Sequence, residues 1–263
     1  MRYGGELGLY ARMGICQILK FVEGAVMKIE VHPSLERGIA EHGWLHSKHS
    51  FSFADYYNPK RMGFGTLRVI NEDIVEPGRG FGAHSHDNME IVSIVLEGAL
   101  EHKDSMGNHG IIPAGDIQRI SAGTGITHSE FNHSKTDVVH FLQIWVYPKE
   151  RDIKPSYEQK SFSLEGEKNI LLPVVSGTKS SETIYIHQDA TFLLGSLDEG
   201  ITVSHKINDP KHGVYVFVIR GGIGIDGKNL RDGDAAGVID TNVVKIKTDK
   251  ETDVLVMEVP LFR

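Results

Sequence analysis

Residues 78–132 carry the pattern on which the architecture of this chain depends; they include GRGFGAHSHDNME at 78–90, IVSIVLEG at 91–98 and AGTGITHSEFN at 122–132. The first segment contains a His-x-His pair, His84 and His86, and the last contains a His-x-Glu pair, His128 and Glu130. Side chains two positions apart in a strand point to the same face. We therefore predict that these four side chains converge inside a β-barrel as a mononuclear metal site.

The donor atoms of this site restrict the metal without selecting one. Three neutral imidazoles and one carboxylate suit Fe(II), Ni(II), Cu(II), Mn(II) or Zn(II). Glu90 has the same strand parity as His84 and His86, so parity alone leaves either Glu90 or Glu130 as the carboxylate ligand. Four further histidines are expected at the surface or in strand pairing: His102, His109, His133 and His140.

The flanking sequence predicts short strands joined by glycine-rich turns. Strands are expected at 62–76, 99–104, 111–113 and 138–147, and helical periodicity is scarce, which is typical of an all-β barrel or sandwich. The aromatic segment at 44–59 is expected to be an edge strand and loop that packs on the core. The alternative is that this segment helps to wall a pocket.

The second half of the chain repeats the first in outline. Residues 214–221 match 91–98, residues 230–234 match 112–116, and residues 254–260 match 139–148. When Gly221 is set against Gly98, Ile207 and Asp209 answer His84 and His86, and no His-x-Glu pair follows. We predict an N-terminal metal-binding barrel at 27–155, a C-terminal barrel without metal ligands at 156–263, and an extension at 1–26 that is disordered or a start-site artefact.

Composition excludes several classes of protein. A hydrophobic fraction of 40% and a charged fraction of 24% describe a soluble globular chain. The formal net charge of −7 gives no electrostatic reason to bind nucleic acid. No apolar run approaches the roughly 18 residues of a membrane span. A single cysteine, Cys16, excludes an intramolecular disulfide framework, so we expect a cytoplasmic protein. We also expect the protein to be a monomer.

Two motifs in this stretch resemble those of the cupins. Gly78-x5-His84-x-His86-x3-Glu90, with Gly98 beyond it, resembles the first cupin motif, and Pro113-x-Gly115 followed by His128-x3-Asn132 resembles the second. Gly98 lies one residue later than usual, and residues 117–125 lengthen the second motif. Both departures, together with the sequence motifs at 51–53, 62–73 and 122–130, resemble features of the pirin branch of the cupins.

The resemblance implies an all-β bicupin, with two tandem jelly-roll-like barrels and metal only in the first. It places the ligands at His84, His86, His128 and Glu130, which favours Glu130 over Glu90. It implies one divalent metal per chain, iron(II) first, with nickel, copper, manganese, cobalt or zinc as alternatives.

Bacterial pirins resemble quercetin 2,3-dioxygenases, which cleave a flavonol with dioxygen and release carbon monoxide. Glu130 would then also be the catalytic base that deprotonates the flavonol 3-hydroxyl. The expected partners are a flavonol and dioxygen, without direct nucleic-acid or membrane binding. The alternatives are a metal-bearing redox-sensing or regulatory protein without turnover, in line with the transcriptional role of animal pirins, and a metal-dependent cupin isomerase.

Overall fold

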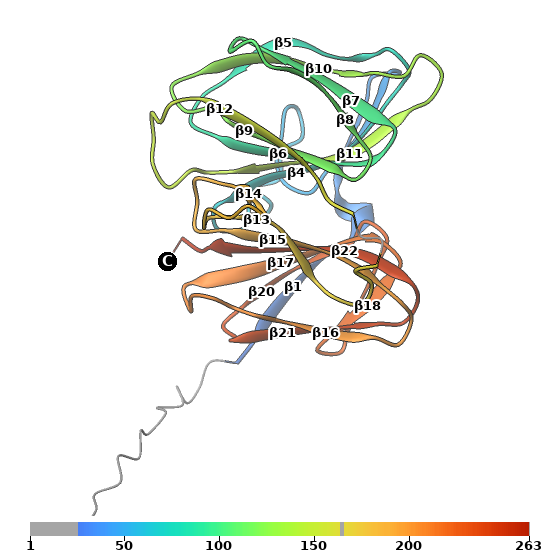
Figure 1. Ribbon diagram of the computed structural model, residues 1–263. Coiled ribbons are helices and arrows are strands. Elements are labelled where there is room, and N and C mark those ends of the chain that lie inside the picture. Colours follow the sequence, from blue (N-terminus) through green and yellow to red (C-terminus); the bar gives the residue numbers. More distant parts are fainter. Residues whose placement is uncertain (1–25, 164–165, 263) are drawn as a thin grey trace, which may run out of the picture.

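The structure, a computed structural model, describes residues 26–163 and 166–262. Figure 1 shows two β-barrels stacked on each other, and their sheets form four successive layers. The only helical element among the described residues is the 3₁₀ turn η1 (Ser34–Glu36), and none of their helices is long and apolar enough to span a membrane. The predicted extension at 1–26 lies outside the described residues except for Val26.

The N-terminal barrel consists of a seven-stranded and a four-stranded sheet. The larger sheet has the order β12 (Ser156–Ser161), β9 (Asp116–Ser121), β6 (Glu90–Glu97), β11 (Val139–Val146), β4 (Leu67–Val75), β3 (Leu45–His49) and β2 (Gly38–Glu41). The smaller sheet has the order β5 (Gly80–His86), β10 (Ile126–Asn132), β7 (Ala99–Asp104) and β8 (His109–Pro113). Both predicted ligand pairs therefore lie on adjacent strands of the smaller sheet.

The C-terminal barrel has the same two-sheet construction. Its larger sheet has the order β1 (Lys28–His32), β20 (Ala235–Ile239), β17 (His212–Arg220), β22 (Thr252–Pro260), β15 (Thr191–Leu197), β13 (Leu172–Ser176) and β14 (Ile184–Tyr185). Its smaller sheet has the order β16 (Thr202–Lys206), β21 (Val243–Thr248), β18 (Gly222–Ile225) and β19 (Lys228–Arg231).

Strand order confirms the predicted duplication and the all-β fold of two tandem barrels. The run β9-β6-β11-β4 corresponds to β20-β17-β22-β15, and β5-β10-β7-β8 corresponds to β16-β21-β18-β19. Gly98 and Gly221 occupy equivalent turns, with φ of 75° and 108°. A Cβ atom at Gly98 would lie 2.5 Å from the Val138 carbonyl oxygen, so both backbone angle and space require glycine there.

Two strands differ from the predicted division at 155/156. β1 pairs with β20 and so belongs to the C-terminal barrel, and β12 pairs with β9 and so belongs to the N-terminal barrel. Each covers an edge of a large sheet whose backbone groups would otherwise be unpaired. The boundaries 27–155 and 156–263 need correction at these two strands, and elsewhere the division stays a prediction.

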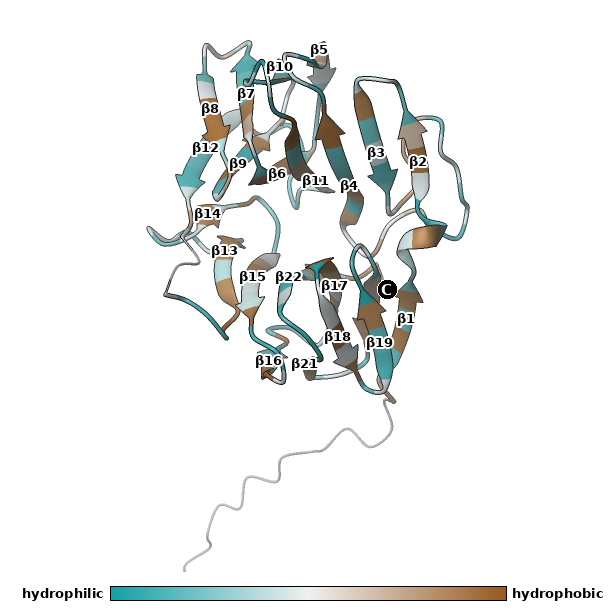
Figure 2. Ribbon diagram, turned by 90° about the vertical axis from the view of Figure 1, so that its right-hand side faces the viewer, coloured by the Kyte–Doolittle hydropathy of each residue, from teal (hydrophilic) through white to brown (hydrophobic). Residues whose placement is uncertain are grey.

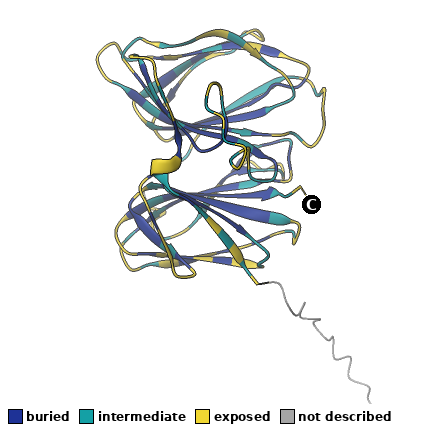
Figure 3. Ribbon diagram, turned by 180° about the vertical axis from the view of Figure 1, so that it is seen from behind, coloured by how far each residue is buried: buried dark blue, intermediate teal, exposed yellow. Residues whose placement is uncertain are grey.

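The largest apolar core joins the two barrels. It includes Phe51 and Ile144 from the N-terminal barrel and Phe192, Tyr215 and Met257 from the C-terminal barrel, all essentially buried. Figure 3 shows these inner layers as buried, and Figure 2 shows the bands of hydrophobic and hydrophilic residues expected of strands that separate two environments. The large sheets therefore pack on each other through one face, and their other faces line the barrel interiors, of which the C-terminal one is filled by a second apolar cluster.

Candidate metal centre

Three histidines converge between β5 and β10. His84 pairs directly with His128 across the two antiparallel strands, and His86 lies two residues further on β5. Their ring centroids are 4.4 Å apart for His84 and His128, 4.8 Å for His84 and His86, and 5.0 Å for His86 and His128. One ring nitrogen of each lies within 4.8 Å of the others, which is the spacing of ligands around one ion.

The protonation and pairing of these rings fit a divalent cation. Burial, with smaller effects from neighbouring histidines, lowers the pKa of His128 to about 3 and that of His86 to about 4, so both rings are neutral near pH 7. Both nitrogens of His128 are buried without a hydrogen-bond partner. His84 Nδ1 lies 2.8 Å from the Gly82 carbonyl oxygen, and a proton on Nδ1 leaves Nε2 free for a metal.

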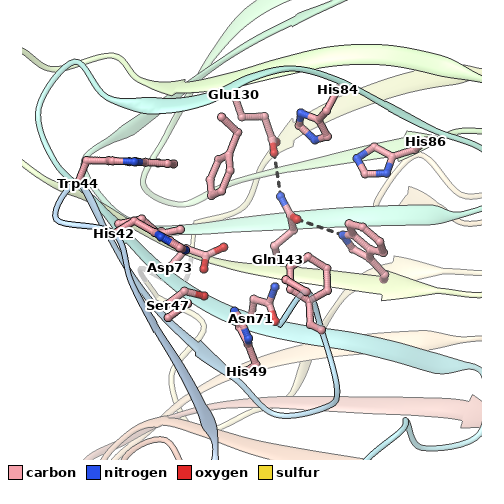
Figure 4. A pocket seen from close by; sticks show the side chains of 16 residues that line it. His42, Trp44, Ser47, His49, Asn71, Asp73, His84, His86, Glu130 and Gln143 are labelled. Carbon is pink, nitrogen blue, oxygen red and sulfur yellow. Dashed lines mark hydrogen bonds between the residues drawn. The ribbon is translucent and has the colours of Figure 1, made fainter. Parts of the chain in front are cut away.

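Glu130 is held at one side of the histidine group. A β-bulge between His128 and Glu130 shifts the register of β10 against β5, so Glu130 pairs with Phe81. Its buried carboxylate accepts hydrogen bonds from Gln118 Nε2 at 2.5 Å and from Gln143 Nε2 at 2.8 Å. Figure 4 shows this carboxylate directed toward Gln143 and beside His84.

A second group with ligand spacing contains His102, His128 and Glu130. His102 is opposite Glu130 in the β7–β10 register, is fully buried, and has Nε2 3.1 Å from Asp104 Oδ2. His102 thus takes the strand-pairing position that was one of the two expected for it, but it is fully buried and lies within ligand spacing of His128 and Glu130. His109 and His133 do lie at the surface, each beside Glu101, and His140 pairs with Glu72. No sequence pattern predicts the pairing of β7 with β10 that places His102 opposite Glu130.

Glu90 lies at the boundary between the barrels and belongs to neither ligand group. Its Oε2 accepts hydrogen bonds from Ser121 Oγ at 2.9 Å and from the His187 backbone N–H at 3.1 Å. Parity with His84 and His86 therefore does not bring Glu90 to the same place, because the turn at 87–89 separates β5 from β6 and moves the chain to the other sheet. Glu130, unlike Glu90, lies within ligand spacing of His128.

A cavity of about 330 Å³ opens beside the histidines. His84, His86 and Glu130 line one side, and the aromatic walls are formed by Trp44, Phe53, Phe81 and Trp145. The segment at 44–59 thus does both things considered for it, since Phe51 packs in the core whereas Trp44 and Phe53 wall the cavity. A space with flat apolar walls and a few polar groups fits a planar aromatic ligand.

The C-terminal barrel fills the corresponding region differently. On β21 the buried residues are Val244, Ile246 and Thr248, where β10 carries His128 and Glu130. The matching strand β16 ends at Lys206, so the alignment of Ile207 and Asp209 with His84 and His86 was wrong. The cause is the loop that follows each strand, because the loop between β16 and β17 is longer than the loop between β5 and β6.

The buried residues of β16 are Val203 and His205, and His205 Nε2 lies 2.7 Å from Glu258 Oε2. Glu258 also pairs with His212 Nδ1 at 2.8 Å and accepts two hydrogen bonds from Asn208. Among the described residues, both groups with metal-ligand spacing lie in the N-terminal barrel. The geometry therefore supports one divalent metal, bound in that barrel.

Comparison with known proteins agrees with this architecture. A family model described as Pirin matches residues 31–146, and one described as Quercetinase C-terminal cupin domain matches residues 173–259. The quercetin 2,3-dioxygenase of Escherichia coli K12 is 42% identical over 226 residues, which cover 86% of this chain and 96% of the relative.

Solved structures show the same fold. A bacterial pirin, YhhW of Escherichia coli in complex with nickel(II), is 40% identical with a TM-score of 0.85, and the match covers 89% of this chain and 100% of that one. A quercetin 2,3-dioxygenase of Acinetobacter baumannii is 17% identical with a TM-score of 0.71 over 88% of this chain and 85% of that one, which shows a shared fold. With both barrels matched in order and a relative at 42% identity over nearly its whole length, the chain belongs to the pirin family of bicupin proteins.

Proposed function

We propose that this chain is a metal-dependent dioxygenase that cleaves a flavonol such as quercetin with dioxygen and releases carbon monoxide. The observation that carries the proposal is the aromatic-walled cavity, which opens directly onto His84, His86 and Glu130. The quercetin 2,3-dioxygenase name of the Escherichia coli relative supports the same substrate.

The residues that would hold the metal are His84, His86, His128 and Glu130. We propose iron(II) as the native ion, and the nickel(II) complex of the Escherichia coli pirin makes nickel the first alternative. When bound, the ion supplies a Lewis acid and an orienting centre for substrate and dioxygen. The unpaired, neutral His128 ring is the part of the site that depends most on a cation, because no protein group satisfies its nitrogens.

Glu130 is the proposed general base. Its carboxylate lines the cavity, so a flavonol 3-hydroxyl placed there transfers its proton to a Glu130 oxygen and becomes an alkoxide. The amides of Gln118 and Gln143 fix both carboxylate oxygens. Gln143 is held in turn by Trp145 Nε1, which donates to Gln143 Oε1 at 3.1 Å. The aromatic walls cover the faces of the substrate and exclude water from the charged oxygen.

The test is turnover by protein that has been freed of metal and reloaded without oxygen with iron(II), nickel(II) or another single divalent ion. Quercetin and dioxygen are then added, and dioxygen uptake and carbon monoxide release are measured together. We expect equimolar uptake and release by the wild type and none by His84→Ala. Glu130→Gln should keep substantial metal and lose about 10²-fold to 10⁴-fold in kcat.

His109→Ala is the matched control, because His109 is an exposed histidine of the same barrel. It should turn over quercetin like the wild type. Metal-loaded wild type that binds its ion and releases no carbon monoxide would refute the dioxygenase proposal and favour the regulatory or redox-sensing alternative. A Glu130→Gln variant with near wild-type turnover would refute the assignment of the base.

A further inference from the structure

A band of polar side chains covers the side of the cavity opposite the histidines. It is formed by Ser47 and His49 on β3 and by Asn71 and Asp73 on β4, and we call these four residues the polar floor. Ser47 pairs with Asp73 and His49 pairs with Asn71 in the strand register, so the four form two adjacent cross-strand pairs. Figure 4 shows them on the large sheet, across the cavity from His84 and His86.

The polar floor contains buried atoms without partners. His49 and Asn71 are 3% and 2% exposed, and neither His49 Nδ1 nor Asn71 Oδ1 has a hydrogen-bond partner. Buried polar groups in proteins are nearly always paired, and both residues that carry these unpaired atoms line the same cavity, which points to a polar ligand there. Ile70, on the opposite face of the same strand, packs in the apolar core between the barrels, so the polar residues are confined to the cavity face of β4.

Asp73 adds a hydrogen-bonding group that is unusual in a buried position. Burial, and to a smaller extent the charge of Glu130, raises the pKa of Asp73 to about 7, although the Ser47 hydroxyl and Arg37 oppose this. The carboxyl group is therefore able to accept a hydrogen bond when ionised and to donate one when protonated. Both forms match a phenolic hydroxyl, which is itself a donor and an acceptor.

We propose that the polar floor recognises the hydroxyl groups on the part of a flat aromatic substrate that points away from the histidines. The cavity thereby selects polyhydroxylated aromatic compounds over the same ring system without hydroxyls. This rests on the proposed function, because it assumes that the aromatic substrate occupies the cavity beside the ion. Discrimination arises because a ligand that lacks hydroxyls leaves polar atoms of His49 and Asn71 buried and unpaired and offers Asp73 no hydrogen bond.

The test compares the affinities of three flavonols that share the 3-hydroxyl group: quercetin, galangin, which lacks hydroxyls on the pendant phenyl ring, and 3-hydroxyflavone, which lacks all other hydroxyls. Binding to metal-loaded protein without oxygen is followed by quenching of tryptophan fluorescence, since Trp44 and Trp145 line the cavity. We expect the wild type to bind quercetin at least about 10-fold more tightly than 3-hydroxyflavone, as two or more hydrogen bonds predict. Galangin reports which ring faces the floor.

Two variants separate recognition from folding. Asn71→Leu and Asp73→Leu, which replace each polar group with an apolar one of similar size, should each lower the quercetin to 3-hydroxyflavone affinity ratio by about 5-fold or more, while metal content and 3-hydroxyflavone affinity stay within about 2-fold. Asn242→Leu, the same substitution as Asn71→Leu at an exposed residue of the C-terminal barrel, is the control and should keep the wild-type ratio.

The possible results distinguish this inference from the proposed function. A wild-type ratio near one, absence of quercetin binding, or an unchanged ratio in both Asn71→Leu and Asp73→Leu overturns the inference, even if quercetin is cleaved. A lower ratio of quercetin affinity to 3-hydroxyflavone affinity in these variants supports the inference about the polar floor. If, in addition, no preparation releases carbon monoxide, only the dioxygenase proposal fails.

Discussion

Replacing Asp73 with asparagine should stabilise the metal-free protein above neutral pH. Asp73 is 3% exposed, and burial is the main cause that raises its pKa from 3.8 to about 7. The folded state therefore retains a proton that the unfolded chain releases. As pH rises from about 4 to 7, the unfolded state loses this proton first, so ionisation of Asp73 progressively destabilises the fold.

The magnitude follows from the size of the shift. One pKa unit corresponds to about 1.4 kcal/mol, so a shift of about three units amounts to roughly 4 kcal/mol above pH 7. Relaxation of the cavity and water entry reduce this value, and we expect Asp73→Asn to gain about 1–4 kcal/mol at pH 8. Below about pH 4 the carboxyl is protonated in both states, and the gain should vanish.

The assay is denaturant unfolding of metal-free wild type and Asp73→Asn at several pH values from 4 to 8.5. The difference in unfolding free energy should rise with pH and level off above about pH 7. Asp55→Asn, at an exposed aspartate of the same barrel, is the control and should show no such rise. A difference that is independent of pH, or a wild type that is more stable at pH 8, would refute the reasoning.

Two further predictions concern buried ionic groups away from the cavity. Burial raises the pKa of Glu72, but hydrogen bonds and charge from His140 and Arg37 outweigh it and lower this pKa to about 2. Glu72→Gln should therefore reduce the free energy of unfolding by about 1–3 kcal/mol at pH 7. In unfolding measured at several pH values, this difference should disappear as the pH falls from about 4.5 to about 2. Glu258→Ala leaves His205 and His212 without their carboxylate and should destabilise the C-terminal barrel by about 3–5 kcal/mol in thermal unfolding, with the metal content of the folded protein unchanged.

Strand periodicity was sufficient for the parts of the site that depend on one strand at a time. His84 with His86, and His128 with Glu130, share a face because residues two apart always do, and the glycine turns at Gly98 and Gly221 revealed the duplication. The fold class followed from the same local signals. Strand parity left the choice between Glu90 and Glu130 open, and the family resemblance favoured Glu130. The strand pairing then showed that β5 and β10 are neighbours.

Features that depend on register between strands were missed. His102 meets Glu130 only through the β7–β10 pairing. The register shift between β5 and β10 places the extra residue in β5 between Phe81 and His84, where Gly82 is a local sign of a bulge but does not give the new register. Glu90 has the parity of a ligand but lies across a turn in another sheet, where it pairs with Ser121. The exchange of β1 and β12 between barrels likewise depends on which sheet edges are open after the strands have assembled.

The polar floor shows the same limit at the cavity. Asn71 and Asp73 lie in a strand whose alternation is evident, but only the assembled barrel shows that their face looks across a cavity at the histidines. A polar face on a strand is ordinarily read as the solvent side. Asn71 and Asp73 are buried because the smaller sheet of the barrel covers this face of β4.

The central claim, that His84, His86, His128 and Glu130 hold one divalent ion in the N-terminal barrel, is tested most directly by metal stoichiometry. Wild type, His128→Ala and His109→Ala are freed of metal, reloaded with a single divalent ion, dialysed and analysed for metal per chain. The wild type and His109→Ala should each retain one ion, and His128→Ala should retain much less after the same dialysis, because it has lost one of the four proposed ligands. One ion per chain in His128→Ala at wild-type affinity would contradict the assignment.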